Sequence, residues 1–93
     1  MSEETKQQII KVYEGLKALQ LIKNELYNDS ALRPLGIFCK DSSDIQIRSR
    51  LDDKLSRVKN STELRRNDCA DIIGYVVLLM ISEGWTEFED LVD

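Results

Sequence analysis

The amino-acid sequence predicts an all-α fold, a small helical bundle with a central apolar helix that is completed by oligomerisation. Three segments of the 93 residues carry apolar side chains at helical spacing, and the chain contains only one proline and four glycines. The third of these segments, from Cys69 to Ile81, is apolar on almost every side, which is atypical of a surface helix. At this length we expect one domain over residues 1–93.

The first predicted helix covers approximately residues 4–27. Apolar residues recur at steps of three and four positions, and charged side chains fill the other faces; the apolar positions are Ile9, Val12, Leu16, Leu19, Ile22 and Leu26. A stripe of this kind predicts a core face or the seam of a dimer.

Residues 28–42 break this pattern with Asn-Asp-Ser, Pro34 and Gly36, yet they include Leu35 and Phe38. This predicts a loop with apolar residues to bury. It either lines a pocket or packs against the bundle as a simple connector.

The second predicted helix covers approximately residues 44–60, and Ser43 to Gln46 matches a capping box. At 100° per residue Lys54 lies inside the apolar stripe of this helix, while Arg50, Asp53 and Arg57 lie along one flank. This position allows two interpretations of Lys54. In the first, its stem extends along the apolar face to solvent; in the second, its ammonium group is held inward against a carboxylate or a ligand phosphate.

The third predicted helix covers approximately residues 67–83, with Gly84 as the residue after its C-terminus. We expect it to be buried on several sides, and a second chain is the simplest way to cover it. A short helix over residues 86–92 is expected to pack Trp85, Phe88 and Leu91.

Composition excludes several classes of function. The chain has no histidine, which removes His-based triads and the commonest transition-metal ligand, whereas a carboxylate-bound Mg²⁺ remains compatible with the sequence.

Cys39 and Cys69 are expected to be reduced, and the polar N-terminus lacks the layout of a secretion signal. The longest apolar run is half the length of a membrane span. We therefore expect a cytoplasmic protein that does not enter the membrane.

The net charge of −4 argues against nonspecific binding to nucleic acid. Charge is unevenly distributed, however. Residues 40–66 contain eight basic and five acidic residues, a net of +3, which leaves −7 for the rest of the chain. The middle segment is therefore suited to holding a small anion.

The best candidate site lies at the start of the third helix. Asp68, Asp71 and Tyr75 are spaced by three and four residues, so their side chains project from one side of the helix. Two carboxylates at this spacing can share a Mg²⁺ ion that neutralises nucleotide phosphates. Equally, both acids can be structural, because acids in a first helical turn complement the helix dipole and Asp71 can pair with Arg50, Lys54 or Arg57.

The segment from Asp68 to Leu79 resembles the acid-x-Ala-Asp helix of the MazG-type all-α nucleoside triphosphate pyrophosphohydrolases. It more closely resembles the Asp-Tyr helix of small phage and bacterial proteins called nucleotide-modification-associated domain 1. Their preceding helix reads Arg-x-x-Asp-Lys-x-x-Arg, which residues 50–57 match. The resemblance covers about residues 37–81 and implies site positions at Asp53, Lys54, Arg57, Asp71 and Tyr75. The second acidic pair of the MazG type, E-x-x-E, is broken here.

Three hypotheses follow. The first is a nucleotide-binding or nucleotide-sequestering homo-oligomer of phage type, which would act in the host cytoplasm on a nucleotide or cyclic nucleotide; its ligand-binding residues would be Arg50, Asp53, Lys54, Arg57, Asp71 and Tyr75. The second is a Mg²⁺-dependent pyrophosphohydrolase that holds its metal with Asp68, Asp71 and Asp53. The third is a structural or protein-interaction bundle in which the charges form salt bridges. The broken acidic pair favours binding over hydrolysis.

Overall fold

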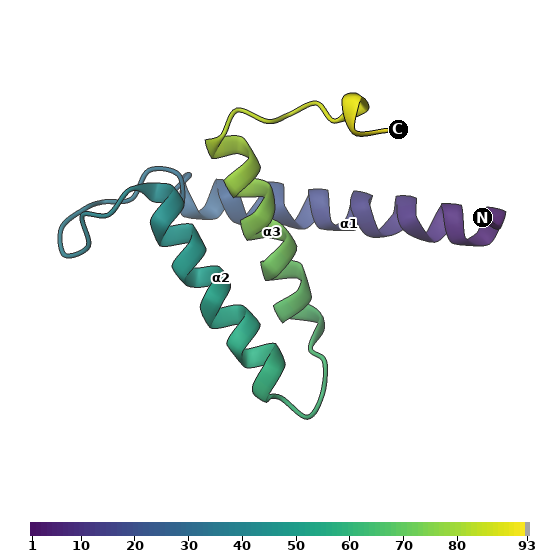
Figure 1. Cartoon of the computed structure of the whole chain (residues 1–93), viewed down its shortest axis with the longest axis horizontal. Coiled ribbons are helices and arrows are strands. Elements are labelled where there is room, and N and C mark those ends of the chain that lie inside the picture. Colours follow the sequence, from purple (N-terminus) through teal and green to yellow (C-terminus); the bar gives the residue numbers. More distant parts are fainter. Residues whose placement is uncertain (93) are drawn as a thin grey trace.

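The computed structural model describes residues 1–92, which form three α-helices and no strand (Figure 1). The helices are α1 (Glu3–Tyr27), α2 (Ser43–Asn60) and α3 (Arg66–Ser82), and a single 3₁₀ turn, η1 (Glu89–Leu91), follows near the C-terminus. The predicted all-α fold is confirmed. Each α-helix begins and ends within one residue of its predicted bounds.

The predicted capping box at the start of α2 is wrong. The N-cap is Ser42, and its hydroxyl donates to the Asp44 carboxylate over 2.6 Å instead of accepting a helix N–H. The Gln46 amide donates to the Asp41 carbonyl over 2.7 Å. Ser43 is therefore the first residue of the helix and not its N-cap, so Gln46 lies one position beyond the place that a capping box requires.

The end of α3 matches its prediction at Gly84. This residue has a φ of 77°, a left-handed conformation that glycine adopts without steric cost. Its N–H donates to the Ile81 carbonyl, and the Trp85 N–H donates to the Met80 carbonyl, each over 2.9 Å. These two bonds form a Schellman motif, which satisfies carbonyls that the helix leaves free.

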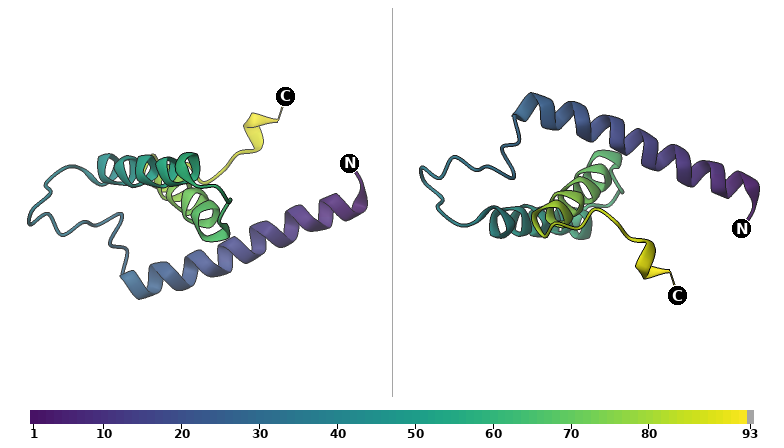
Figure 2. Two further views of the ribbon diagram at one scale, coloured as in Figure 1. Left: turned by 90° about the horizontal axis from the view of Figure 1, so that it is seen from below. Right: turned by 90° about the horizontal axis from the view of Figure 1, so that it is seen from above.

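The apolar helix α3 is central, because it packs against both other helices. α2 lies along one side of α3, whereas α1 crosses α3 in a separate layer and does not pack on α2 within residues 1–92 (Figure 2). Ile47 of α2 is completely buried, and it is the one apolar side chain that residues 1–92 place in a core. The α2–α3 pair is therefore the best-packed part of the chain.

The expectation that α1 contributes a core stripe is not met within this chain. Of the six stripe residues only Leu16 is partly covered. The N-terminal half of α1 extends beyond α3 (Figure 2), and the C-terminal half packs on α3 alone, which leaves Leu19, Ile22 and Leu26 exposed. The expected burial of α3 is not met either. Ile73, Val76 and Ile81 are exposed and the other apolar residues of α3 are half-buried, since two helices cover only two sides of it.

The connecting loop, in part, and the C-terminal tail also differ from their expectations. The start of the loop meets its expectation, since Ser30, Ala31 and Leu32 line pockets, whereas Leu35 and Phe38 are exposed. In the tail, Trp85, Phe88 and Leu91 are exposed as well, so the predicted packing of this segment is wrong. The tail leaves the end of α3 and extends toward the side on which the N-terminal half of α1 lies (Figure 1).

Both cysteines are free thiols. None of the helices in residues 1–92 combines the length and the apolar content needed to cross a membrane.

Candidate functional site

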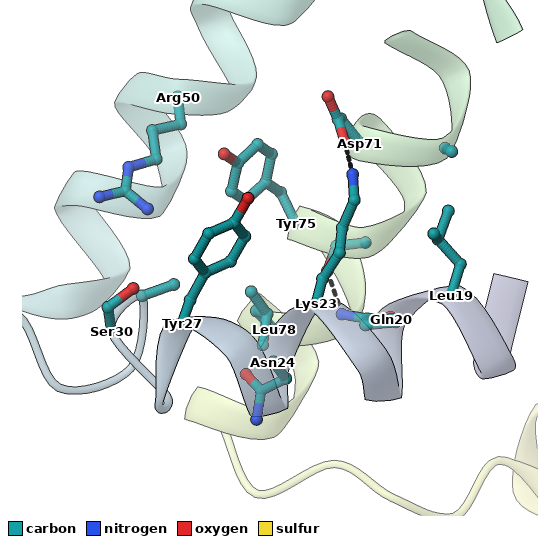
Figure 3. Close-up of a pocket in the computed structure, with 13 residues that line it drawn as sticks. Leu19, Gln20, Lys23, Asn24, Tyr27, Ser30, Arg50, Asp71, Tyr75 and Leu78 are labelled. Atoms are coloured by element: carbon teal, nitrogen blue, oxygen red, sulfur yellow. Dashed lines mark hydrogen bonds and ion pairs between the residues drawn. The ribbon is translucent and has the colours of Figure 1, made fainter. Parts of the chain in front are cut away.

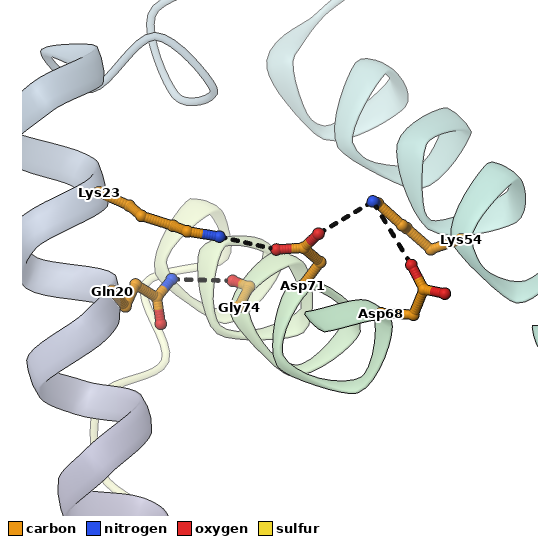
Figure 4. A network of polar contacts seen from close by, with 6 residues as sticks. All are labelled: Gln20, Lys23, Lys54, Asp68, Asp71 and Gly74. Atoms are coloured by element: carbon orange, nitrogen blue, oxygen red, sulfur yellow. Dashed lines mark hydrogen bonds and ion pairs between the residues drawn. The ribbon is translucent and has the colours of Figure 1, made fainter. Parts of the chain in front are cut away.

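A network of charged side chains joins the three helices at the N-terminal half of α3 (Figure 4). Asp71 is at its centre. One carboxylate oxygen of Asp71 accepts from Lys23 of α1 over 3.0 Å, and the other lies 2.9 Å from the Nζ of Lys54 on α2. Each oxygen of this carboxylate thus ties α3 to a different helix.

Lys54 also lies 3.8 Å from a carboxylate oxygen of Asp68, one helical turn before Asp71. Its side chain is only 17% exposed and that of Asp68 is 6% exposed. The ammonium group of Lys54 is therefore held inward, against two carboxylates. Of the two interpretations of this lysine, the structure shows the inward one.

The electrostatic setting of Asp71 keeps it ionised. Partial burial alone would raise the pKa of this carboxyl group, but the hydrogen bonds and charges of Lys54 and Lys23 outweigh burial. The pKa of Asp71 therefore lies below its ordinary value of 3.8. Its charge is balanced by lysines at neutral pH.

A polar contact beside this network positions α1 on α3. The side-chain amide of Gln20 donates to the backbone carbonyl of Gly74 over 2.9 Å (Figure 4). In an α-helix this carbonyl already accepts an N–H from the following turn, so Gln20 uses its second lone pair.

A pocket of about 240 Å³ opens next to the network, between α1, α2 and α3 (Figure 3). The rings of Tyr27 and Tyr75 lie at its centre, with the Arg50 guanidinium group on one side and the Lys23–Asp71 pair on the other. Asn24 and Ser30 add polar groups to the lining. The pocket therefore combines aromatic faces, cations and hydrogen-bonding groups in one place.

The structure brings together three of the residues expected at the site, since Arg50, Asp71 and Tyr75 all line the pocket. Lys54 adjoins it through Asp71. Asp53 and Arg57 do not line the pocket and are exposed on α2.

Sequence reasoning did not single out the other lining residues, among them Lys23, Asn24, Tyr27 and Ser30. A signal for two of them was present. The helical face that begins at Leu16 continues at steps of four, three and four positions with Gln20, Lys23 and Tyr27. Polar residues on a face that also carries a core residue indicate contacts with another helix or a ligand.

The arrangement of acids bears on the expected Mg²⁺ site at Asp68 and Asp71. The ammonium group of Lys54 lies between these two carboxylates, at the position where a shared cation would bind. Within residues 1–92 there is no cluster of three or more metal-ligating side chains. Lys54 and Lys23 together thus balance the charges of the two aspartates.

Comparison with known proteins found no family model, no curated protein and no solved structure that matches the chain.

Proposed function

We propose that this protein binds a nucleotide in the pocket between the three helices. One observation carries the proposal. Two tyrosine rings, Tyr27 and Tyr75, share a pocket with the Arg50 guanidinium group (Figure 3). A nucleotide needs both components, a flat apolar surface for its base and cations for its phosphates.

The tyrosine rings are suited to the base. Stacking of a base on an aromatic side chain contributes about 1 to 3 kcal/mol and requires no particular base. Small-molecule pockets usually have volumes of about 300 to 1,000 Å³, and this one is smaller at about 240 Å³. We therefore expect the base to enter the pocket and the phosphates to remain at its open edge.

Arg50 is suited to the phosphates. It makes no ion pair within residues 1–92, whereas Lys54 and Lys23 are both engaged by Asp71. A guanidinium group binds two phosphate oxygens at once through its planar set of donors. Around the pocket, three cations (Lys23, Arg50 and Lys54) face two carboxylates (Asp68 and Asp71), so the local charge is +1.

The proposal is tested by isothermal titration calorimetry with a panel of nucleoside monophosphates, triphosphates and cyclic dinucleotides. We expect at least one ligand to bind with a Kd in the micromolar range. Arg50→Gln should weaken it at least about tenfold, the loss of one charged hydrogen-bonding group. Arg57→Gln is the matched control, because Arg57 lies on the same helix, is exposed and does not line the pocket.

Tyr75→Ala should weaken the same ligand about tenfold to a hundredfold through the loss of stacking. Circular dichroism verifies that each variant remains helical. Binding of no member of the panel by the wild-type protein overturns the proposal. Equal losses in Arg50→Gln and Arg57→Gln would place the ligand elsewhere.

One observation favours a second candidate function, a structural bundle without a small ligand. Both oxygens of Asp71 are engaged by lysines from different helices, as expected of a residue that fastens the fold. In that case Asp71→Asn lowers stability and no nucleotide binds. With nucleotide binding, the same variant lowers stability and also changes affinity, because it frees Lys23 and Lys54 beside the pocket and raises the local charge from +1 to +2.

A further inference from the structure

An apolar groove runs along the other flank of α1, next to the proposed ligand pocket. It has a volume of about 310 Å³, and its walls come from α1, from α3 and from Leu32 of the connecting loop. Tyr13, Leu16 and Leu21 form the α1 wall, and Val77 and Ile81 are among the residues of the α3 wall. Lys17 is the one charged side chain in its lining. The groove therefore exposes the apolar helix α3 to solvent.

We infer that a second copy of this chain covers the groove by laying its α1 antiparallel along α1. The first support is the exposed area. The chain exposes 7985 Å², whereas a compact monomer of this mass exposes roughly 5,500 Å². The excess of roughly 2,500 Å² matches what each chain buries in an obligate homodimer, about 1,000 to 2,500 Å².

The shape of the chain agrees with this area. Its radius of gyration is 15.3 Å, against roughly 12 Å for a compact chain of this length. The larger radius of gyration comes from the N-terminal half of α1, which extends beyond α3 (Figure 2). Every residue from 1 to 15 is exposed, including Ile10 and Glu14. This half of α1 contributes to no core in its own chain.

A second copy suits this surface because an antiparallel pairing of α1 is self-complementary. If the two-fold axis passes between Gly15 and Leu16, positions whose numbers add up to 31 face each other. Ile10 then meets Leu21 of the second copy, and Glu14 meets its Lys17. Within one chain these four residues lie on one flank of α1, about 60° wide at 100° per residue. The pairing thus joins apolar with apolar residues, and it places the Glu14–Lys17 ion pairs of the two chains, each 3.7 Å long within its own chain, beside each other.

The first test is analytical ultracentrifugation of the wild-type chain. We expect a dimer or a larger symmetric assembly of dimers in the micromolar range, and a thermal midpoint that rises with protein concentration. A chain that sediments as a monomer at all concentrations, and unfolds cooperatively at a constant midpoint, overturns the inference. The groove would then have another partner or none.

Substitution tests the location of the contact. Leu21→Glu should raise the dimer dissociation constant at least about a hundredfold, because each interface loses two leucine contacts and gains two buried charges. Leu64→Glu is the matched control, since Leu64 is 73% exposed against 63% for Leu21 but lies in the α2–α3 connection. Equal effects of the two substitutions on dissociation would overturn the proposed location.

Disulfide trapping tests the antiparallel geometry. In a Cys39→Ser/Cys69→Ser chain, Ile10→Cys with Leu21→Cys should give a covalent dimer under mild oxidation. The two positions are about 16 Å apart along one helix, so they cannot bond within a chain. Lys11→Cys with Leu21→Cys is the control, because Lys11 points about 100° away. Equal cross-linking of both pairs contradicts the antiparallel pairing.

Discussion

Lys54 and Asp71 show how single residues hold this small fold together. Lys54 is 17% exposed and lies between two carboxylates, whereas Lys23, on the other side of Asp71, is 43% exposed. Solvent screens the second pair more than the first. The two lysines contact the same carboxylate, yet they should differ in their contributions to stability.

Replacement of each lysine by methionine measures this difference. We expect Lys54→Met to lower the free energy of unfolding by about 2 to 4 kcal/mol, because it leaves Asp68 buried without a cation. Lys23→Met should lower it by about 1 kcal/mol or less. Urea denaturation followed by circular dichroism gives both values. A larger loss in Lys23→Met would contradict this assignment of the buried charge.

The lowered pKa of Asp71 predicts a pH dependence of stability. Because this pKa lies below 3.8 in the folded chain, the unfolded chain binds more protons at acidic pH. The stabilisation by Asp71 is fully present above the unfolded pKa, near pH 4, and is lost as the pH falls through the folded pKa. We expect Asp71→Asn to flatten the acid limb of the stability curve, measured by urea denaturation between about pH 6 and pH 3.

The control for this pH series is Asp53→Asn, the same substitution at an exposed position of α2. It should leave the acid limb unchanged. If Asp71→Asn retains the wild-type limb, the lysine contacts of Asp71 do not stabilise the folded chain.

At the scale of the helices, α2 and α3 form the packed unit and α1 is attached to it by few contacts. Ile47 of α2 is completely buried, but Ile45, two positions earlier, is 50% exposed. In an α-helix these positions point in different directions, about 200° apart. The pair therefore provides a matched comparison within one turn of the same helix.

We expect Ile47→Val to lower the free energy of unfolding by about 0.5 to 1.5 kcal/mol, because it removes a buried methyl group and leaves a small cavity. Ile45→Val should change it by less than about 0.5 kcal/mol. Chemical denaturation measures both. Equal effects would show that α2 turns a different face to α3.

For the whole molecule, the extended shape predicts unequal local stability. The residues of α1 before Leu16 are all exposed, whereas α2 and α3 pack on each other. In dilute solution we expect the amides of Glu3–Glu14 to exchange with deuterium first and those around Ile47 to exchange last. Mass spectrometry after timed exchange measures this order. Equal protection of both segments in a monomeric sample would contradict the observed packing.

Local patterns were sufficient to predict the helices. Periodicity located all three to within one residue, and Gly84 marked the end of α3 correctly. The helical projection also placed Lys54 on the apolar face of α2, where the structure has it. These features depend on residues a few positions apart, so the sequence contains the information directly.

Features that depend on distant segments were harder to predict. Lys23 and Tyr27 of α1 reach a site whose predicted residues, Arg50, Asp71 and Tyr75, lie more than twenty positions later. Their role depends on the angle at which α1 crosses α3, which no local pattern specifies. The packing of Trp85 and Phe88 was predicted incorrectly for the same reason. The apolar character of a residue does not show whether another helix lies close enough to cover it.

The sequence by itself determined the all-α class and the helix bounds. It also determined that the chain is acidic overall while its middle segment, residues 40–66, is basic. Those properties follow from local propensity, periodicity and residue counts. Only the tertiary structure decided that Asp71 is shared between Lys23 and Lys54, that Arg50 joins two tyrosines in one pocket, and that most of α1 remains uncovered. The physical reason is that charge pairing and burial depend on how helices cross in space.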